Sequence, residues 1–307
     1  VEHPAIVADE QGHVGVSWLE AVSHEESTLW YAHSYDGGAS FAPGMRVNKA
    51  SHVETAMVSL TADEAGNPII AWLQGGAVRL ARSENRGLTF PLNEVVDAEV
   101  CDCCQPQPLV VGEKIFVAYR NLEKSSEGDK RIIYVARSLD DGASFEKPVP
   151  VSDAAWYFNA CPISGPAMIS DGTRLYVSWM DGRHDETGDL SRADVWLAIS
   201  EDGGQSFSAN VRVNPVEGDY HNLPSLALGP GGRLHIAWEA REAARQVIYY
   251  AFSDDGGQRF STPRMVTSSE GATQRGPSNA SLALDGTGRI YVAWVDGHGA
   301  YVAVWEE

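Results

Sequence analysis

One short phrase recurs six times along this 307-residue chain and limits what the chain can fold into. Each copy is a run of mostly apolar residues that ends in Trp or Tyr. The copies occupy residues 14–18, 69–72, 116–119, 176–179, 235–238 and 291–294. A shorter apolar segment and a turn precede each copy, and a third apolar segment follows it. Each repeat of about 50 residues therefore predicts one antiparallel sheet.

Six such repeats predict an all-β fold, in which residues 1–307 form a single six-bladed β-propeller domain. The expected blades are approximately residues 1–50, 51–98, 99–155, 156–216, 217–270 and 271–307.

A second signature follows the third apolar segment in five of the six repeats. It begins with Ser, continues with Asp or Asn and a Gly-containing turn, and ends in Phe. Its copies are residues 34–41, 83–90, 138–145, 200–207 and 253–260. An Asp or Asn side chain can bond the backbone of its own turn, and Gly supplies a positive φ, so we expect structural residues here.

This signature resembles the Asp box of the sialidase-like (BNR-repeat) propellers, and the resemblance extends over almost the whole chain. The sixth repeat has no box, so we expect its sheet to have three strands or to be completed by residues outside this sequence. The resemblance is specific for the fold and does not fix the activity.

The resemblance also implies a set of sialidase residues that this chain lacks in part. Sialidases hold the substrate carboxylate with three arginines, the first in an Arg-x-Pro segment at the start of the first blade. They use a Tyr nucleophile paired with Glu, and an Asp acid. Here the first segment reads Val1-Glu2-His3-Pro4, so Glu2 stands where the arginine belongs. We therefore expect no sialidase activity.

In propellers of this kind, the starts of the innermost strands and the ends of the second strands share one face, and the Asp boxes lie on the opposite one. Function is expected on the first face. Polar residues on this face could serve a hydrolase, a lyase or a carbohydrate-binding protein. The possible acids and bases are Asp181, Glu239 and Asp296, and the possible anion-binding residues are Arg120, Arg183, Arg241 and Arg275.

All four cysteines lie at the starts of the third and fourth innermost strands, which indicates a shared role. One interpretation is a thiolate metal site, because soft sulfur ligands select copper(I) or zinc. The candidate ligands are Cys101, Cys103, Cys104, Cys161, His3, His221 and Met57. The other interpretation is disulfides, for which four cysteines allow three pairings. The adjacent Cys103 and Cys104 do not match common zinc modules, so the ion stays open.

The net charge of the chain limits the kinds of molecule that it can bind. The chain has 23 Lys and Arg against 42 Asp and Glu, a net charge of −19, which would repel nucleic acid and anionic lipids. No segment approaches the roughly 20 apolar residues that span a bilayer. We expect a secreted or periplasmic protein whose signal peptide is absent from this sequence. It should bind a metal ion or a small glycan, with binding favoured over catalysis.

Overall fold

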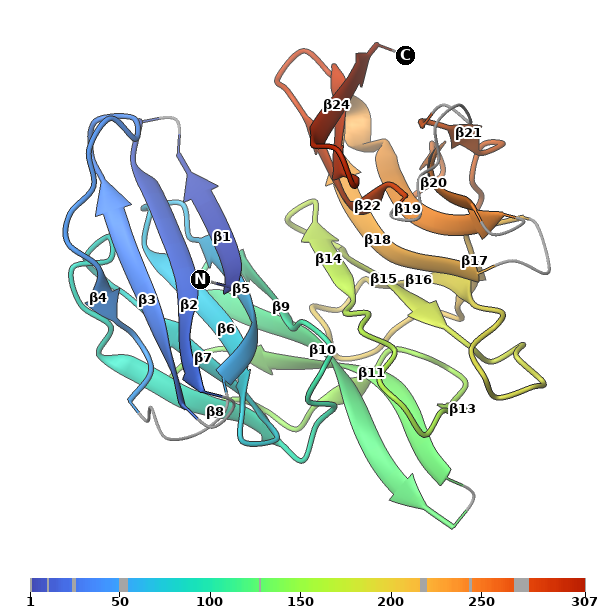
Figure 1. The fold of residues 1–307 in the computed structure, drawn as a ribbon, viewed down its shortest axis with the longest axis horizontal. Helices are drawn as coiled ribbons and strands as arrows, with labels where there is room; N and C mark the ends of the chain where they lie inside the picture. Colours follow the sequence, from blue (N-terminus) through green and yellow to red (C-terminus); the bar gives the residue numbers. More distant parts are fainter. Residues whose placement is uncertain are drawn as a thin grey trace. The chain divides into compact units, whose positions relative to one another are not determined.

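The computed structural model describes residues 2–9, 11–23, 26–49, 55–126, 128–215, 220–242, 245–267 and 276–306. They form six antiparallel sheets that follow one another along the chain, which confirms the predicted all-β fold and six blades (Figure 1). The chain divides into two compact units. The first holds Val1–Glu123 and Tyr134–Val149, and the second holds Lys124–Ile133 and Pro150–Glu307.

The first three sheets begin in the first unit. The first sheet comprises β1 (Glu2–Ala8), β2 (Val14–Ser23), β3 (Glu26–Ser34) and β4 (Met45–Arg46). The second comprises β5 (Thr55–Ala62), β6 (Pro68–Gln74), β7 (Ala77–Arg82) and β8 (Leu92–Ala98). The third comprises β9 (Gln107–Val111), β10 (Lys114–Ser125), β11 (Gly128–Ser138), β12 (Val149–Pro150) and β13 (Trp156–Tyr157).

The last three sheets belong to the second unit. The fourth sheet comprises β14 (Ala167–Ser170), β15 (Leu175–Asp181), β16 (Asp194–Ser200) and β17 (Val211–Arg212). The fifth comprises β18 (Tyr220–Leu228), β19 (Leu234–Glu242), β20 (Arg245–Ser253) and β21 (Arg264–Met265). The sixth has three strands, β22 (Ser278–Leu284), β23 (Ile290–Val295) and β24 (Ala300–Trp305).

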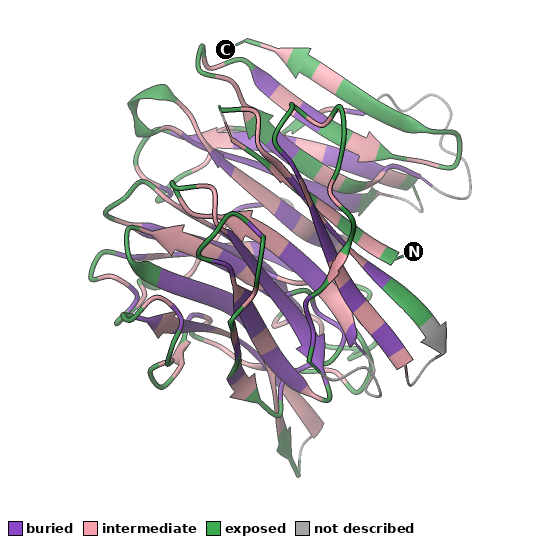
Figure 2. Cartoon of the chain, turned by 90° about the vertical axis from the view of Figure 1, so that its left-hand side faces the viewer, coloured by how far each residue is buried: buried purple, intermediate pink, exposed green. Residues whose placement is uncertain are grey.

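The second strand of each sheet carries the repeated phrase and supplies much of the core. Figure 2 shows buried positions along the strands and exposed positions in the connecting turns. The aromatic residues that end the phrase in the middle four sheets are Trp72, Tyr119, Trp179 and Trp238, and all four are buried. Trp238 of the fifth sheet belongs to one buried cluster with Ile236 of the same sheet and Leu197 of the fourth sheet. A buried Trp contributes a large apolar area, so these residues hold the strands in register.

The five predicted boxes form turns with one shared hydrogen-bond pattern, and we call them the serine–aspartate turns (residues 34–41, 83–90, 138–145, 200–207 and 253–260). In the fourth, Ser200 Oγ accepts from Gly204 N at 2.8 Å and donates to Asp202 at 2.8 Å. In the second, Ser83 Oγ bonds Gly87 N at 2.8 Å and Asn85 at 2.9 Å. The turns therefore satisfy their own polar groups.

Serine hydrogen bonds also fix the charge of these turns. Such bonds lower the pKa of Asp36, Asp140 and Asp202 from 3.8 to about 2, chiefly through Ser34, Ser144 and Ser206 respectively.

Helix is nearly absent from the described part of the chain, where a single 3₁₀ turn, η1 (Pro230–Gly232), occurs. None of the described residues belongs to a helix long and apolar enough to cross a membrane.

Candidate functional site

Four innermost strands share an irregularity near their first residues. The register to the second strand shifts between Glu2 and Ala5 in β1 and between Ala56 and Ser59 in β5. The same shift occurs in β18 and β22. Within each shift lies a non-glycine residue with positive φ: His3 at 47°, Met57 at 53°, Leu223 at 46° and Asn279 at 56°.

At these bulges the regular pairing of the innermost strand with the second strand is interrupted. A non-glycine residue in the left-handed region costs on the order of 1 kcal/mol or more, and such residues gather at functional sites. Bulges re-aim side chains in the same settings. His3, Met57 and Asn279 all lie in segments where the sequence predicts a ligand-facing mouth. The ligand-facing role of these segments stays a prediction.

In the first unit, the segment between β8 and β9 brings three sulfur atoms together. Cys101 Sγ lies 3.5 Å from Cys103 Sγ and 3.4 Å from Cys104 Sγ, and the latter two are 4.0 Å apart. Cys101 and Cys104 are fully buried and Cys103 is 9% exposed. We call these residues the cysteine trio.

The trio is fixed to the middle of β10. Cys101 N donates to the Arg120 carbonyl at 3.2 Å, and Val100 forms a β-bridge with Asn121. The three cysteines pack with Leu122 as one small cluster. Backbone bonds and apolar contacts therefore hold the sulfur atoms in place, while the Arg120 side chain is buried in β10.

The oxidation states of the four cysteines differ. Cys101 and Cys104 carry thiols, whereas Cys103 and Cys161 are disulfide-bonded. The sequence left thiols, disulfides and metal ligands as alternatives for these cysteines. The structure contains both thiols and disulfide-bonded cysteines. Cys161 precedes β14 and is exposed.

The trio has the spacing that a metal–thiolate centre requires. A metal–sulfur bond of about 2.3 Å at tetrahedral angles separates the sulfur atoms by about 3.8 Å, close to the distances observed. Their ligand atoms all lie within 4.8 Å of one another, and His3 does not join that group in the described part of this unit. Met57 packs instead against the apolar cluster of the second and third sheets.

In the second unit, Glu239 on β19 is a buried carboxyl group. It is 8% exposed and accepts a hydrogen bond from the backbone N–H of Asn279, at the bulge of β22. Burial raises the pKa of Glu239 from 4.5 to about 7, although the N–H groups of Asn279 and Ala280 lower it in part. A carboxyl group with this pKa can hold and release a proton near neutral pH.

Asp181 and Arg183 are engaged with each other. The guanidinium donates to both carboxylate oxygens, from Nε at 3.0 Å and Nη2 at 2.8 Å. It also bonds Asp153 at 2.6 Å and lies 4.2 Å from the centre of the Trp196 ring. Asp181 further accepts from Trp179 Nε1 at 3.2 Å. This network ties together the second and third strands of the fourth sheet.

The other predicted site residues have local partners. Asp296 accepts from the backbone N–H groups of His298 and Gly299 in its own turn, at 2.7 and 3.1 Å. Arg241 lies 5.2 Å from the centre of the Tyr220 ring. His221 Nδ1 accepts from Trp238 Nε1 at 3.0 Å, so a metal could reach this ring only through Nε2. Arg275 lies outside the described residues.

Sequence reasoning missed a relay in the fourth sheet. His184 Nδ1 lies 2.8 Å from Asp194 Oδ2, and Asp194 Oδ1 accepts from Asn214 at 2.7 Å. Asn214 in turn accepts from the backbone N–H of Val195 at 2.8 Å. These residues are up to 30 positions apart in the sequence, so only the pairing of β15 with β16 and β17 brings them together. Their one local signal is the polar stretch after Asp181.

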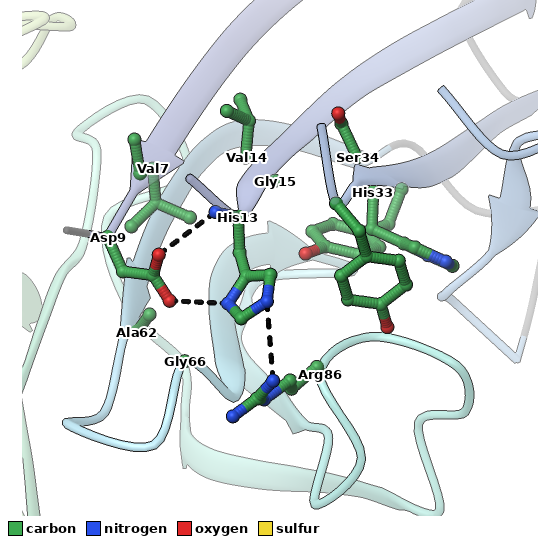
Figure 3. A pocket seen from close by; sticks show the side chains of 13 residues that line it. Val7, Asp9, His13, Val14, Gly15, His33, Ser34, Ala62, Gly66 and Arg86 are labelled. Atoms are coloured by element: carbon green, nitrogen blue, oxygen red, sulfur yellow. Dashed lines mark hydrogen bonds and ion pairs between the residues drawn. The ribbon is translucent and has the colours of Figure 1, made fainter. Parts of the chain in front are cut away.

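A small pocket in the first unit is lined by Asp9, His13 and Arg86 (Figure 3). Asp9 Oδ2 lies 2.7 Å from His13 Nδ1, and Arg86 lies 3.3 Å from His13 Nε2. The same hairpin turn recurs in the second sheet, where Asp63 accepts from the Asn67 side chain at 3.0 Å. The Asp9–His13 contact therefore belongs to a repeated turn.

Comparison with known proteins identifies the fold. No protein-family profile matches the chain, and no curated protein is similar to it in sequence. Solved structures do match. A protein of unknown function from Dyadobacter fermentans is 16% identical, with a TM-score of 0.62 over 85% of this chain and 81% of that one. The NanB sialidase of Streptococcus pneumoniae is 9% identical, with a TM-score of 0.62 over 99% and 68%.

The chain has the sialidase-type six-bladed β-propeller fold. An α-L-arabinanase of Penicillium chrysogenum, solved with arabinobiose, is also similar to it, at 17% identity and a TM-score of 0.58 over 81% of this chain and 77% of that one. Similarity at such identities shows the fold of this sialidase-type propeller. Its activity has to be argued from the site.

Proposed function

We propose that this sialidase-type propeller is an extracytoplasmic protein that binds a soft metal ion through Cys101, Cys103 and Cys104 when Cys103 is reduced. The observation that supports this is the approach of three buried sulfur atoms to within 3.4–4.0 Å. Thiolates favour copper(I) or zinc among the common ions. Structural zinc takes four ligands, and the trio offers three, so copper(I) is the better fit.

The proposed site needs three thiolates, so it depends on the state of Cys103. A disulfide-bonded sulfur carries no negative charge and is a poor ligand, whereas the thiolate is the metal-binding form. The oxidised protein, in which Cys103 is disulfide-bonded, should therefore bind copper(I) weakly. A reductant should create the site.

Anaerobic copper(I) titration against a coloured chelator, with a phosphine reductant present, tests this proposal. We expect one tightly bound ion per chain and a thiolate-to-copper absorption band. Cys104→Ser should weaken binding at least about tenfold, because it removes one direct ligand. Cys161→Ser leaves the trio intact and is the matched control. Absence of copper(I) uptake by the fully reduced protein would reject the proposal.

We also propose that the protein does not cleave sialosides. Glu2 lies in β1 at the position where the sialidase resemblance implies an arginine. A carboxylate there would repel the substrate carboxylate, and guanidinium is the group whose geometry suits it. Fluorogenic sialosides should give no turnover at any pH between about 4 and 8, and turnover that is lost on mutation of Glu239 would contradict this.

A second candidate function, cleavage of a neutral glycan, rests on Glu239. A buried carboxyl group with a pKa near 7 is the kind of group that serves as a general acid in glycoside hydrolysis. The arabinanase with the same fold was solved with arabinobiose, so arabinan oligosaccharides are the first substrates to screen. Glu239→Gln should abolish any activity found, and Asp296→Asn, which alters a turn, should not.

A further inference from the structure

Four of the outer strands are attached to their sheets by the same pair of hydrogen bonds. In the first sheet, the N–H of Val47, just after β4, donates to the Leu29 carbonyl at 2.8 Å. The Leu29 N–H in turn donates to the Asn48 side chain at 2.9 Å. One residue of the third strand thus bonds two successive residues of the outer segment. We call this arrangement the valine clasp.

The valine clasp recurs in the third, fourth and fifth sheets. There a Val N–H donates at 2.8 Å to the carbonyl of Ile133, Val195 or Ile248. The N–H of the same residue donates to a Ser, Asn or Thr side chain, at 3.1, 2.8 and 3.1 Å respectively. The four clasp segments are Met45-Arg46-Val47-Asn48, Val149-Pro150-Val151-Ser152, Val211-Arg212-Val213-Asn214 and Arg264-Met265-Val266-Thr267. All four end in Val followed by a side chain with an amide or hydroxyl oxygen.

Ala300 in β24 occupies the clasp position of the sixth sheet. In the first sheet, Leu29 lies opposite Leu19, the residue that follows the phrase-ending aromatic. The fourth and fifth sheets have the same register. Ala300 lies opposite Val295, which follows the aromatic of the sixth sheet. Ala300 is therefore the counterpart of Leu29.

The hairpin between β23 and β24 directs the backbone groups of Ala300 outward. The Asp296 N–H donates to the Gly299 carbonyl at 3.0 Å, so these two residues form a hydrogen-bonded pair. Pairs alternate along an antiparallel ladder, so the next pair, Val295 and Ala300, is not hydrogen-bonded. The N–H and C=O of Ala300 therefore face away from β23. No described strand pairs with that edge, since the sheet order is β22-β23-β24 (Figure 1).

We propose that the outer edge of β24 binds an extended segment of a partner polypeptide with the sequence apolar–Arg–Val followed by Asn, Ser or Thr. The partner's Val donates its N–H to the Ala300 carbonyl, and the next side chain accepts from the Ala300 N–H. In such strand addition, main-chain bonds supply affinity and side chains supply specificity. This interaction is independent of the metal binding and glycan cleavage proposed above.

An aromatic ring lies opposite the residue that precedes the clasp valine. Trp30 in the first sheet pairs with Arg46, and Trp196 in the fourth pairs with Arg212, while a Met takes this place in the fifth. Tyr301 is the counterpart in β24, because it too pairs with the phrase-ending aromatic of its sheet, and it is 42% exposed. A guanidinium group stacks favourably on such a ring. The net charge of −19 also favours a cationic segment.

Fluorescence polarisation with a labelled peptide tests this proposal on the full chain. The peptide copies residues 43–49, which contain the clasp segment of the first sheet. We expect saturable binding of one peptide per chain. N-methylation of the peptide valine removes the donor to the Ala300 carbonyl and should weaken binding at least about fivefold. Lys49→Arg in the peptide keeps the charge, lies outside the clasp and is the matched control.

Variants of the protein locate the bound peptide. Ala300→Pro removes the outward N–H without removing a ladder bond to β23, and should abolish measurable binding. Ala300→Val keeps both backbone groups and should bind as the wild type does. Tyr301→Ala should weaken binding of the original peptide but not of an Arg46→Ala peptide, so it tests the edge even if Ala300→Pro does not fold. Circular dichroism checks the folding of each variant.

A peptide that does not bind, or that binds Ala300→Pro and Tyr301→Ala as tightly as the wild type, would overturn the proposal. Sedimentation of the protein alone tests a different occupant of the same edge. A dimer that Ala300→Pro dissociates would mean that a second copy of this chain covers β24, and would overturn it as well.

Discussion

The serine–aspartate turns and the starts of the innermost strands use polar side chains in opposite ways. Each turn satisfies itself: Ser200 and Asp202 bond groups no more than four residues away. The start of β22 is instead bonded from a distant segment, because the Glu239 side chain on β19 accepts from the Asn279 N–H, 40 residues on. Polar side chains that form hydrogen bonds within their own turn recur from blade to blade, whereas those that bond distant segments differ from one blade to the next.

One repeated position within the core also differs between blades. The residue after the phrase-ending aromatic is Leu19, Leu73, Arg120, Met180, Glu239 or Val295 in the six sheets. Four of the six are apolar, as a propeller core requires. The two ionisable ones, Arg120 and Glu239, are nevertheless buried. Burying an ionisable group costs free energy unless it has partners, and Glu239 has one in the backbone N–H of Asn279.

The largest expected effect concerns a repeated position. Trp179→Ala should lower the free energy of unfolding by about 3–5 kcal/mol, because it empties a fully buried site in the fourth sheet. Urea denaturation followed by fluorescence measures it. Val302→Ala, which alters a strand residue that is 58% exposed, is the control. Equal losses in the two variants would mean that the phrase does not define the core.

Glu239 should make stability depend on pH. Its pKa is about 7 in the folded protein and 4.5 ordinarily, so the unfolded chain loses this proton first as pH rises. The folded state is therefore penalised between about pH 4.5 and 7, by about 3 kcal/mol in full. Wild-type protein should be less stable at pH 8 than at pH 5. Glu239→Gln should remove most of that difference in urea denaturation at the two pH values.

A single serine–aspartate turn should contribute less. Ser200→Ala removes the buried acceptor of the Gly204 N–H, which should cost about 2 kcal/mol. Ser206→Ala, at an exposed serine of the same turn, should cost less than about 1 kcal/mol. Thermal unfolding of both variants distinguishes the two serines. If the order were reversed, the aspartate rather than the buried serine would organise the turn.

The smallest effect on stability is expected at His184. Its side chain is 48% exposed, and Asp194 keeps its bond to Asn214 without it. His184→Ala should therefore change the free energy of unfolding by no more than about 0.5 kcal/mol. A loss above 2 kcal/mol in urea denaturation would place the histidine in the scaffold, along with the repeated turns.

The sequence predicts the parts of this molecule that depend on local pattern. The all-β fold and its six blades follow from the repeated phrase, whose residues lie close together in the chain, and the structure has six antiparallel sheets. Grouping of Cys101, Cys103 and Cys104 was also visible, because a single turn holds them. The oxidation state of Cys103 was not visible from the sequence, since it depends on chain packing rather than on the spacing of cysteines.

Long-range pairing hides the remaining site features from the sequence. The raised pKa of Glu239 arises from burial against a neighbouring sheet, and the His184–Asp194–Asn214 relay from strand register. Asp181 and Arg183 are two residues apart, yet only the structure shows their carboxylate and guanidinium bonded to each other. Patterns of residue type identify where strands begin and end, but not which side chains meet there.

The bulge in four innermost strands has a consequence for how such a protein can diverge. Side chains alternate between faces along a strand, so an extra residue normally exchanges inside for outside over the rest of its length. A bulge absorbs the extra residue locally. Residues ahead of it, such as Glu2 in β1 or Asn222 in β18, are thereby uncoupled from the packing of the residues that follow. In these four blades, a new chemical group at the start of the innermost strand can therefore arise while the packing of the blade interior stays unchanged.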